Sequence, residues 1–535
     1  MSDRTIGGLL HLRARLKPKE PFLWCDGSWL TYAELAALSD RLGAGLHQLG
    51  VAAGDRVAMV LPTERAAVVT VFACARLGAI QVALNTFLRG EFLTHQMRNS
   101  RASIVVTDQL GLEQIRRVIS DLPDLRTIVF VGDMTGADRS GLQAVTVVSY
   151  DDLLASEHVA SFPDVAPASI FSILYTSGTT GMPKGCMMSH RYATNMARAL
   201  CEAGRFDSGD RVLTASPLFH TGGQIFAMMS ALQAAGSIAF VREFHASDFI
   251  ALAQELEATV LFGPGAVGAF ILAQPEREAD RRHRVRQAIF NGLPETTQLA
   301  LEARFGFHVV GEMYGHSEFI PIAISPVGGP RRRESSGRVP PNIEVRIVDD
   351  SDQPLPTGAI GEIVARPKEP GIMFDGYWDN PEATVETWRN LWHHTGDLGR
   401  FDADGFLHFS GRKKEAIRRR GEFVTDRELE MAILKHPDIA SVAVHAVPSE
   451  VTEDEIKAWL VLKPGVSLSP EKFFAFLREG LPYFAIPRFV EIVGALPMNH
   501  NARVMKHELK ARPNGPSTWD LDQMGLVVPR SERRA

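Results

Sequence analysis

The sequence predicts an α/β protein: a large N-terminal domain of mixed and parallel sheets with flanking helices, followed by a small α+β domain. The first observation is length, because 535 residues are too many for one hydrophobic core. The second is the alternation of strand-like and helix-like segments before position 150, which is typical of parallel sheets covered by helices. The third is a run of helix, strand, strand, helix and strand after position 428, long enough for a separate domain.

The N-terminal alternation starts with a helix whose first turn carries a capping box formed by Thr31 and Glu34. Leucines at helical spacing follow, and Gly50 ends the helix. We then expect strands at 55–61, 80–84, 103–107, 127–131 and 145–148, and a helix at 66–77. In the C-terminal domain we expect helices at 430–436 and 470–481 and strands at 439–448, 456–462 and 488–492.

The segment Tyr175–Gly185 is rich in glycine and hydroxyl side chains and carries one lysine. An apolar run at 168–174 precedes it and is expected to be a buried strand, while 189–200 after it is expected to be a helix, giving the order strand, loop, helix. Glycines let backbone N–H groups approach an anion, and hydroxyls and Lys184 add donors. The segment is therefore a candidate polyphosphate loop, although its spacing excludes a Walker loop. A flexible surface loop is the alternative.

Composition narrows the classes of partner. The formal net charge is −6 and no basic stripe dominates, which argues against nucleic acid; the densest basic run, 281–286, is expected on a solvated helix face. The four cysteines have no metal-ligand spacing and are expected to be reduced: Cys25, Cys74, Cys186 and Cys201. Neither a signal segment nor an apolar run of the ~18 residues of a membrane span is present, so we expect a soluble, cytoplasmic protein.

Several later segments carry candidate site residues. His220 lies in the segment 216–223, and strand-to-turn signals occur at 262–265 and 291–294. In the segment 312–318, the ring of Tyr314 can stack on a base and the carboxylate of Glu318 can hold Mg²⁺; the alternative is a helix N-terminus capped by Ser317.

A carboxylate further on, that of Asp397, is another candidate binding residue. Asp397 follows Thr395 and Gly396 in a turn, and its two oxygens can accept hydrogen bonds from two adjacent hydroxyls. His393 and His394 come just before this turn. Because neighbouring residues on a strand face opposite ways, we reject a shared metal site for the two histidines.

In this order, the motifs resemble those of the adenylate-forming superfamily, which includes acyl-CoA synthetases, peptide-synthetase adenylation domains and luciferases. The resemblance spans roughly residues 8–512 and is most detailed with carnitine/crotonobetaine-type acid–CoA ligases, at 412–422 and 481–484. It implies an adenylation domain at 1–410, a hinge at 411–415, a mobile C-terminal lid domain at 416–520 and a tail at 521–535.

The resemblance also implies roles for individual residues. The residues implied to bind ATP or AMP are Thr176, Ser177, Gly178, Thr179, Thr180, Gly181, Lys184, Gly292, Tyr314, Gly315, Ser317, Asp397 and Arg412. Mg²⁺ is expected on Glu318 and Thr180, and catalytic roles on Lys184, His220 and Arg503. Lys414 is the expected hinge residue, and Arg420 and Gly421 are expected to face the acceptor, coenzyme A.

The sequence departs from this family at its last motif. Asn499, Ala502 and Arg503 stand where the family has threonine, glycine and the catalytic lysine. Arginine keeps the charge of lysine but is a larger, planar fork. Lys506, three residues on, is an alternative cation. Two smaller departures, Phe423 and Ala485, also fall on or near the lid.

Three functional hypotheses follow. The first is an acid–CoA ligase that forms an acyl-AMP from ATP·Mg²⁺ and a small acid and then transfers the acyl group to coenzyme A. The second is an adenylating enzyme with another acceptor, such as a nitrite-activating diazotase that acts on an aryl amine in natural-product biosynthesis. The third is a nucleotide-binding relative that has lost catalysis. A homodimer is compatible with all three.

Overall fold

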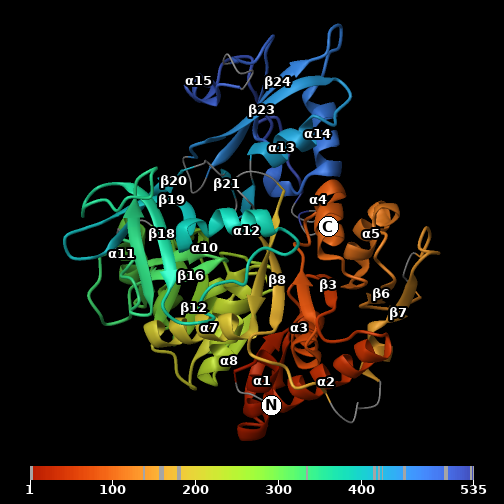
Figure 1. Cartoon of the computed structure of the whole chain (residues 1–535), viewed down its shortest axis with the longest axis vertical. Helices are drawn as coiled ribbons and strands as arrows, with labels where there is room; N and C mark the ends of the chain where they lie inside the picture. Colours follow the sequence, from red (N-terminus) through yellow and green to blue (C-terminus); the bar gives the residue numbers. More distant parts are fainter. Residues whose placement is uncertain are drawn as a thin grey trace.

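Two seven-stranded sheets lie at the centre of the large domain, and a smaller C-terminal domain stands at one end of it (Figure 1). The computed structural model describes residues 4–135, 139–155, 162–176, 182–293, 295–332, 335–413, 417–419, 422–424, 426–449, 454–498, 504–529 and 533. The predicted fold class is confirmed. The boundaries of hinge, lid and tail stay a prediction.

The first sheet has the strand order β7-β6-β5-β3-β4-β8-β9 and is parallel except for the pair β8–β9. Its strands are β3 (Arg56–Val60), β4 (Ile80–Ala83), β5 (Ile104–Thr107), β6 (Thr127–Phe130), β7 (Thr146–Ser149), β8 (Ile170–Thr176) and β9 (Lys184–Ser189). The helices between them are α3 (Arg65–Leu77), α4 (Gly90–Ser100), α5 (Gln109–Val118) and α6 (Tyr150–Leu154). This is the parallel arrangement that the alternating segments predict.

The second sheet has the order β14-β13-β12-β10-β11-β1-β2 and is parallel except for the pair β1–β2. Its strands are β1 (Pro21–Cys25), β2 (Ser28–Thr31), β10 (Arg211–Thr214), β11 (Ser237–Phe240), β12 (Val260–Pro264), β13 (Gln287–Asn291) and β14 (His308–Val310). Its helices are α1 (Ile6–Leu16), α2 (Tyr32–Gln48), α7 (His190–Gly204), α8 (Ser230–Ala234), α9 (Phe249–Glu255), α10 (Gly265–Leu272) and α11 (Glu295–Phe305). One apolar cluster contains residues of both sheets, so the two sheets share a core.

A hairpin and a four-stranded antiparallel sheet complete the large domain. The hairpin is β15 (Met313–His316) and β16 (Phe319–Ile324), and the sheet is β17 (Ile343–Val348), β18 (Gly361–Pro367), β19 (His393–Phe401) and β20 (Leu407–Arg412), with helix α12 (Pro381–Thr387). Ser317 therefore lies in a hairpin turn, and the alternative of a helix N-terminus there is wrong.

The C-terminal domain contains one four-stranded sheet in the order β23-β24-β25-β26. Its elements are β21 (Ile417–Arg419), β22 (Glu422–Val424), α13 (Asp426–Ile433), β23 (Ile439–Val447), β24 (Glu455–Leu462), α14 (Pro470–Gly480), β25 (Phe489–Ile492), α15 (Lys506–Lys510) and β26 (Trp519–Asp520). The edge strand β26 is an addition to the expected elements. After it, Arg533 lies on the cavity that the large domain also lines.

Local sequence signals gave both correct and incorrect predictions. The capping box of Thr31 and Glu34 is present at the start of α2. The order strand, loop, helix is wrong, because β9 follows the glycine-rich segment and pairs with β8 before α7 begins. The basic run 281–286 is not a helix either: a 3₁₀ turn, Glu278–Arg281, leads into extended chain, where Arg286 pairs with buried Asp210 at 2.6 Å. No helix in the described part of the chain is long and apolar enough to cross a membrane.

Candidate nucleotide-binding site

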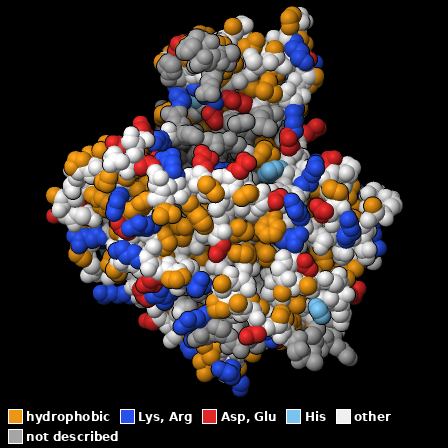
Figure 2. Space-filling model, viewed as in Figure 1, with side chains coloured by type: hydrophobic (Ala, Val, Ile, Leu, Met, Phe, Trp, Pro, Cys, Tyr) orange, Lys and Arg blue, Asp and Glu red, His pale blue; other side chains and the backbone are white. Residues whose placement is uncertain are grey.

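A cavity of about 1620 Å³ opens at the carboxyl ends of parallel strands. Thr176, Pro264 and Asn291, the last residues of β8, β12 and β13, line it together with the hairpin β15–β16. Tyr483 and Arg533 of the C-terminal part also line it, and Figure 2 shows acidic and basic side chains gathered where the two domains meet. The carboxyl edge of an open α/β sheet is where ligands usually bind, so this cavity is the candidate site.

The cavity brings together many of the residues singled out in the sequence. Those that line it are Thr176, Lys184, His220, Gly315, Ser317 and Glu318. Gly292 follows the lining residue Asn291. Tyr314 and Asp397 are buried, and the Tyr314 hydroxyl donates to Asp397 Oδ2 at 2.7 Å. The roles assigned to these residues stay predictions.

Other residues of the predicted site lie outside the described residues. These are Ser177, Gly178, Thr179, Thr180, Gly181, Lys414, Arg420, Gly421 and Arg503, together with the side chain of Arg412. Val504, which follows Arg503, packs with Leu509 of α15, and α15 lies at the end of the C-terminal domain remote from the two large sheets (Figure 1). The ammonium of Lys506 lies 2.6 Å from Glu430 Oε1 within the C-terminal domain and also pairs with Asp426. Lys506 is thus engaged away from the cavity.

Glu318 is a buried carboxylate that lines the cavity from the hairpin turn. Its Oε2 lies 2.8 Å from His316 Nδ1, and its Oε1 accepts hydrogen bonds from Tyr377 at 2.7 Å and Thr176 at 3.3 Å. Burial alone would raise the pKa of Glu318, but His316 and the Tyr377 hydroxyl outweigh it and hold the pKa well below its ordinary value. Glu318 therefore presents a negative charge to the cavity.

These oxygens fit one kind of metal site. The described residues contain no group of three or more His, Cys, Asp or Glu side chains placed to hold a metal ion. A Mg²⁺ ion commonly needs only one or two carboxylates, because waters and substrate phosphates supply its other ligands. Glu318, with the Thr176 hydroxyl beside it, suits a Mg²⁺ ion that arrives with a nucleotide.

Lys184 supplies the cation of the site. It is the first residue of β9, and its ammonium lies 5.0 Å from the centre of the Tyr377 ring. The segment that carries Tyr377 runs beside β9, since Tyr377 forms a bridge with Cys186. The sequence analysis missed Tyr377; its signal is an aromatic residue directly after Gly376, which has positive φ. Tyr377 thus contacts both residues: its ring lies beside the Lys184 ammonium, and its hydroxyl donates to Glu318.

Part of the cavity lining comes from the segment 215–222. His220 lies here, with its ring centre 4.7 Å from that of Phe219. Thr221 Oγ1 is 2.9 Å from Ser317 Oγ, which links this segment to the hairpin. A π-helical segment, Gly222–Met229, follows. A Cβ at Gly223 would lie 2.3 Å from the Pro217 carbonyl oxygen, so the turn that presents His220 requires glycine.

Phe87 and Arg533, which the sequence analysis did not indicate, line the cavity beside Tyr483 of the segment 481–484. The rings of Phe87 and Tyr483 meet edge to face at 4.9 Å, across the two domains. The Arg533 guanidinium lies 5.7 Å from the centre of the Tyr483 ring, and its Nε donates to the Val528 carbonyl. Arg533 therefore forms part of the cavity lining.

The family comparison agrees with this geometry. The AMP-binding enzyme family matches residues 10–378, and the AMP-binding enzyme C-terminal domain matches residues 428–503. The chain belongs to the AMP-binding enzyme family. Within this family, it is 32% identical over 495 residues to the crotonobetaine/carnitine–CoA ligase of Salmonella paratyphi A, covering 91% of this chain and 94% of that relative. The protein is thus an AMP-forming ligase.

Solved structures of this AMP-binding enzyme fold match almost the whole chain. The o-succinylbenzoate CoA synthetase of Bacillus subtilis is 24% identical with a TM-score of 0.81, covering 95% of this chain and 98% of that one. An amide bond synthetase from Marinactinospora thermotolerans is 24% identical with a TM-score of 0.80, covering 94% and 99%. At these identities the likeness shows the fold alone.

Proposed function

We propose that the protein adenylates a small acid with ATP, releases pyrophosphate, and transfers the acyl group to coenzyme A. The observation that carries the proposal is the shared cavity of Lys184, Ser317 and anionic Glu318, which supplies a cation, a hydroxyl and a metal-binding carboxylate. The 32% identical relative is named a crotonobetaine/carnitine–CoA ligase, which supports a small acid and a CoA acceptor.

In the first step, a carboxylate oxygen of the acid attacks the α-phosphorus. The new O–P bond replaces the bond to the β-phosphate, and pyrophosphate leaves. Lys184, with the hydroxyls of Thr176 and Ser317, would hold the phosphates, and Glu318 would hold Mg²⁺ with Thr180. Donors of this kind are each worth on the order of 3 kcal/mol of transition-state stabilisation. Asp397 would hold the ribose.

In the second step, the acceptor thiol attacks the acyl carbonyl, a thioester forms, and AMP leaves. The C-terminal domain would change orientation about Lys414 between the steps, because Arg503 serves the first step and its neighbour Val504 packs at the remote end of that domain. Tyr483 and Arg533 lie on the rim, where the acceptor would enter.

A second candidate keeps the adenylation step and changes the acceptor, for example nitrite activation followed by reaction with an aryl amine. The departures at Arg503, Phe423 and Ala485 favour it, and Ala485 is fully buried two residues after the rim residue Tyr483. An amide bond synthetase shares this fold, so the fold does not determine the acceptor.

The test is pyrophosphate release from ATP·Mg²⁺ with a panel of small acids, with and without coenzyme A, and with nitrite plus an aryl amine. The proposal expects acid-dependent release and a CoA thioester as product. A diazo product without any thioester would establish the second candidate. If pyrophosphate release stays at background level with every acid and with nitrite, the remaining hypothesis is a nucleotide-binding relative that has lost catalysis.

A further inference from the structure

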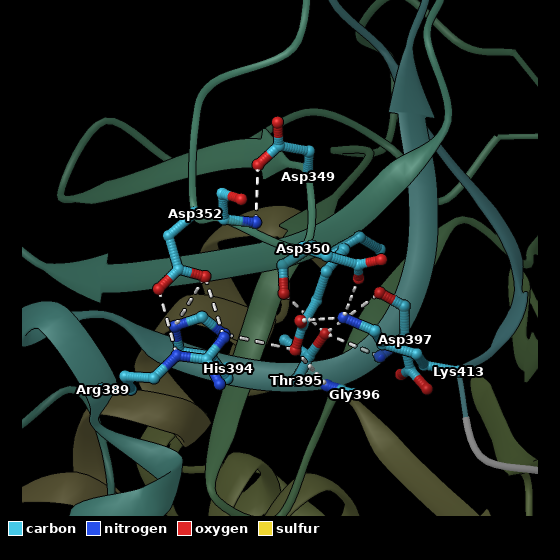
Figure 3. A network of polar contacts seen from close by, with 12 residues as sticks. Asp349, Asp350, Asp352, Arg389, His394, Thr395, Gly396, Asp397 and Lys413 are labelled. Atoms are coloured by element: carbon cyan, nitrogen blue, oxygen red, sulfur yellow. Dashed lines mark hydrogen bonds and ion pairs between the residues drawn. The ribbon is translucent and has the colours of Figure 1, made fainter.

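One buried carboxylate, that of Glu362 on β18, joins three stretches of chain at the edge of the cavity. Its Oε1 accepts from the Gly396 N–H at 3.3 Å and lies 3.3 Å from His394 Nδ1, while its Oε2 lies 3.0 Å from Lys413 Nζ. Figure 3 shows His394, Gly396 and Lys413 gathered in this network. Glu362, His394, Gly396 and Lys413 all line the cavity.

The partners keep Glu362 ionised. The residue is 6% exposed, and a buried carboxylate is unfavourable unless it is paired and hydrogen-bonded. Burial raises the pKa of Glu362, but the hydrogen bonds from His394 and Lys413 outweigh it and lower the pKa to about 2. The contacts of this carboxylate are therefore charge-assisted, the stronger class of hydrogen bond.

Lys413 is attached to the large domain twice. Its backbone N–H donates to the Gly396 carbonyl at 2.8 Å, in addition to the side-chain contact with Glu362. Its other ion-pair partner, Asp350, is 91% exposed, so that pair contributes little. Lys413 immediately precedes the predicted hinge residue Lys414, so it marks the fixed side of the hinge.

The same carboxylate holds the turn that presents Asp397. The Thr395 hydroxyl donates to the Ile363 carbonyl at 2.7 Å and accepts from the Asp397 N–H at 3.1 Å. Gly396 has a φ of +70°, a conformation that favours glycine. The position of the Asp397 carboxylate therefore depends on a short turn whose central N–H is bound by Glu362.

We propose that Glu362 is a positioning residue that holds the Asp397 turn and, through Lys413, the fixed edge of the hinge. The turn and Lys413 thus depend on one anchor. This inference rests on the proposed role of Asp397 in holding the ribose.

The test is AMP affinity, measured by calorimetry on the full chain. Glu362→Gln keeps the shape of the side chain and removes its charge, and Lys413→Met removes its ion-pair partner. Each is expected to weaken AMP binding by about tenfold, as for the loss of a charged hydrogen bond. Asp350→Asn is the matched control, because it removes only the exposed partner of Lys413, and its affinity should stay within about twofold.

A double-mutant cycle separates positioning from general destabilisation. In an Asp397→Asn background, Glu362→Gln is expected to cause no further loss of AMP affinity, because it acts through Asp397. Hydrogen exchange at the Lys413 amide should rise in Glu362→Gln and not in Asp350→Asn. If Glu362→Gln does not fold, Lys413→Met replaces it in the measurements of AMP affinity and hydrogen exchange.

Two outcomes would overturn the inference separately from the proposed function. If the unmodified protein binds AMP and both variants bind it equally well, Glu362 is only a structural residue, whatever happens to the melting temperature. Additive losses in the Asp397→Asn background would exclude action through the turn. If the unmodified protein fails to bind AMP, the proposed function falls and this inference falls with it.

Discussion

The carboxylate of Glu318 is the charge on which catalysis is expected to depend most. Glu318→Gln keeps an acceptor for Tyr377 but removes the charge proposed to hold Mg²⁺. We expect acid-dependent pyrophosphate release to fall by about a hundredfold, in line with the loss of one transition-state contact. Calorimetry with ATP should show that Mg²⁺ no longer strengthens binding. An unchanged release rate would exclude Glu318 from the site.

His393 acts on Glu318 through His316. His316 Nδ1 faces the Glu318 carboxylate, which can only accept, so in neutral His316 the other nitrogen, Nε2, accepts from His393 Nε2 at 3.2 Å. Burial lowers the pKa of His393 well below its ordinary value, which keeps it neutral. His393→Phe removes this donor and is expected to weaken Mg²⁺-dependent ATP binding about threefold to tenfold.

The control for His393 is its neighbour. His394 faces Glu362 instead, so the two adjacent histidines have different partners, as the strand geometry predicts. His394→Asn should leave the Mg²⁺ dependence of ATP binding unchanged. Equal loss in both variants would show that the strand end as a whole, and not the His393–His316 contact, supports the site.

In the hairpin β8–β9, one strand was predicted from the sequence and the other was not. The apolar run of β8 and the Ser189 cap of α7 are local signals, and both elements form where expected. Strand β9 was missed because the segment was interpreted as a loop up to Gly185, and one of the two partners that hold β9, the Tyr377 segment, is distant in sequence. Tyr377 and Glu362 were missed because their partners in the site, Glu318 and Lys413, are distant in sequence.

The contact of β18 with β19 and β20 through Glu362 predicts a pH dependence. The pKa of Glu362 is lowered from 4.5 to about 2 on folding, so its stabilising contribution is complete above the unfolded value and is lost as pH falls from 4.5 to about 2. The groups that face it are His394 and Lys413.

Thermal unfolding of the protein and Glu362→Gln tests this dependence. The variant should melt at a lower temperature than the unmodified protein near about pH 7, and the difference should shrink toward about pH 3. A difference that is constant, or that grows as pH falls, would contradict a paired, ionised Glu362.

The arrangement of whole domains was predictable from the order of local signals, whereas their relative orientation was not. Alternating segments and ordered motifs gave two domains and a site at strand ends. Which face of the C-terminal domain meets the cavity depends on contacts such as that of Phe87 with Tyr483, which join residues far apart in the chain. The rim residue Arg533 lies beyond every motif used, so no pattern pointed to it.

The orientation of the C-terminal domain makes Arg503 a test of domain rotation. Arg503→Ala is expected to lower acid-dependent pyrophosphate release by about a hundredfold, because one well-placed cation is lost from the transition state. AMP affinity should stay within about twofold, because the proposed role of Arg503 is in the adenylation step and not in holding AMP. Lys506→Met is the matched control, since that lysine pairs with Glu430. A larger loss with Lys506→Met would reassign the catalytic cation.

The position of Arg533 at the cavity affects where a purification tag should be placed. Arg533 lines the same cavity as Lys184 and stands close to the last residue of the sequence, Ala535. The N-terminal end of the chain lies at the bottom of the large domain, beside α1 and α2 (Figure 1). A purification tag fused at the carboxyl end would follow closely on Arg533, which lines the cavity, so a hexahistidine leader on the amino end is the safer choice for assays.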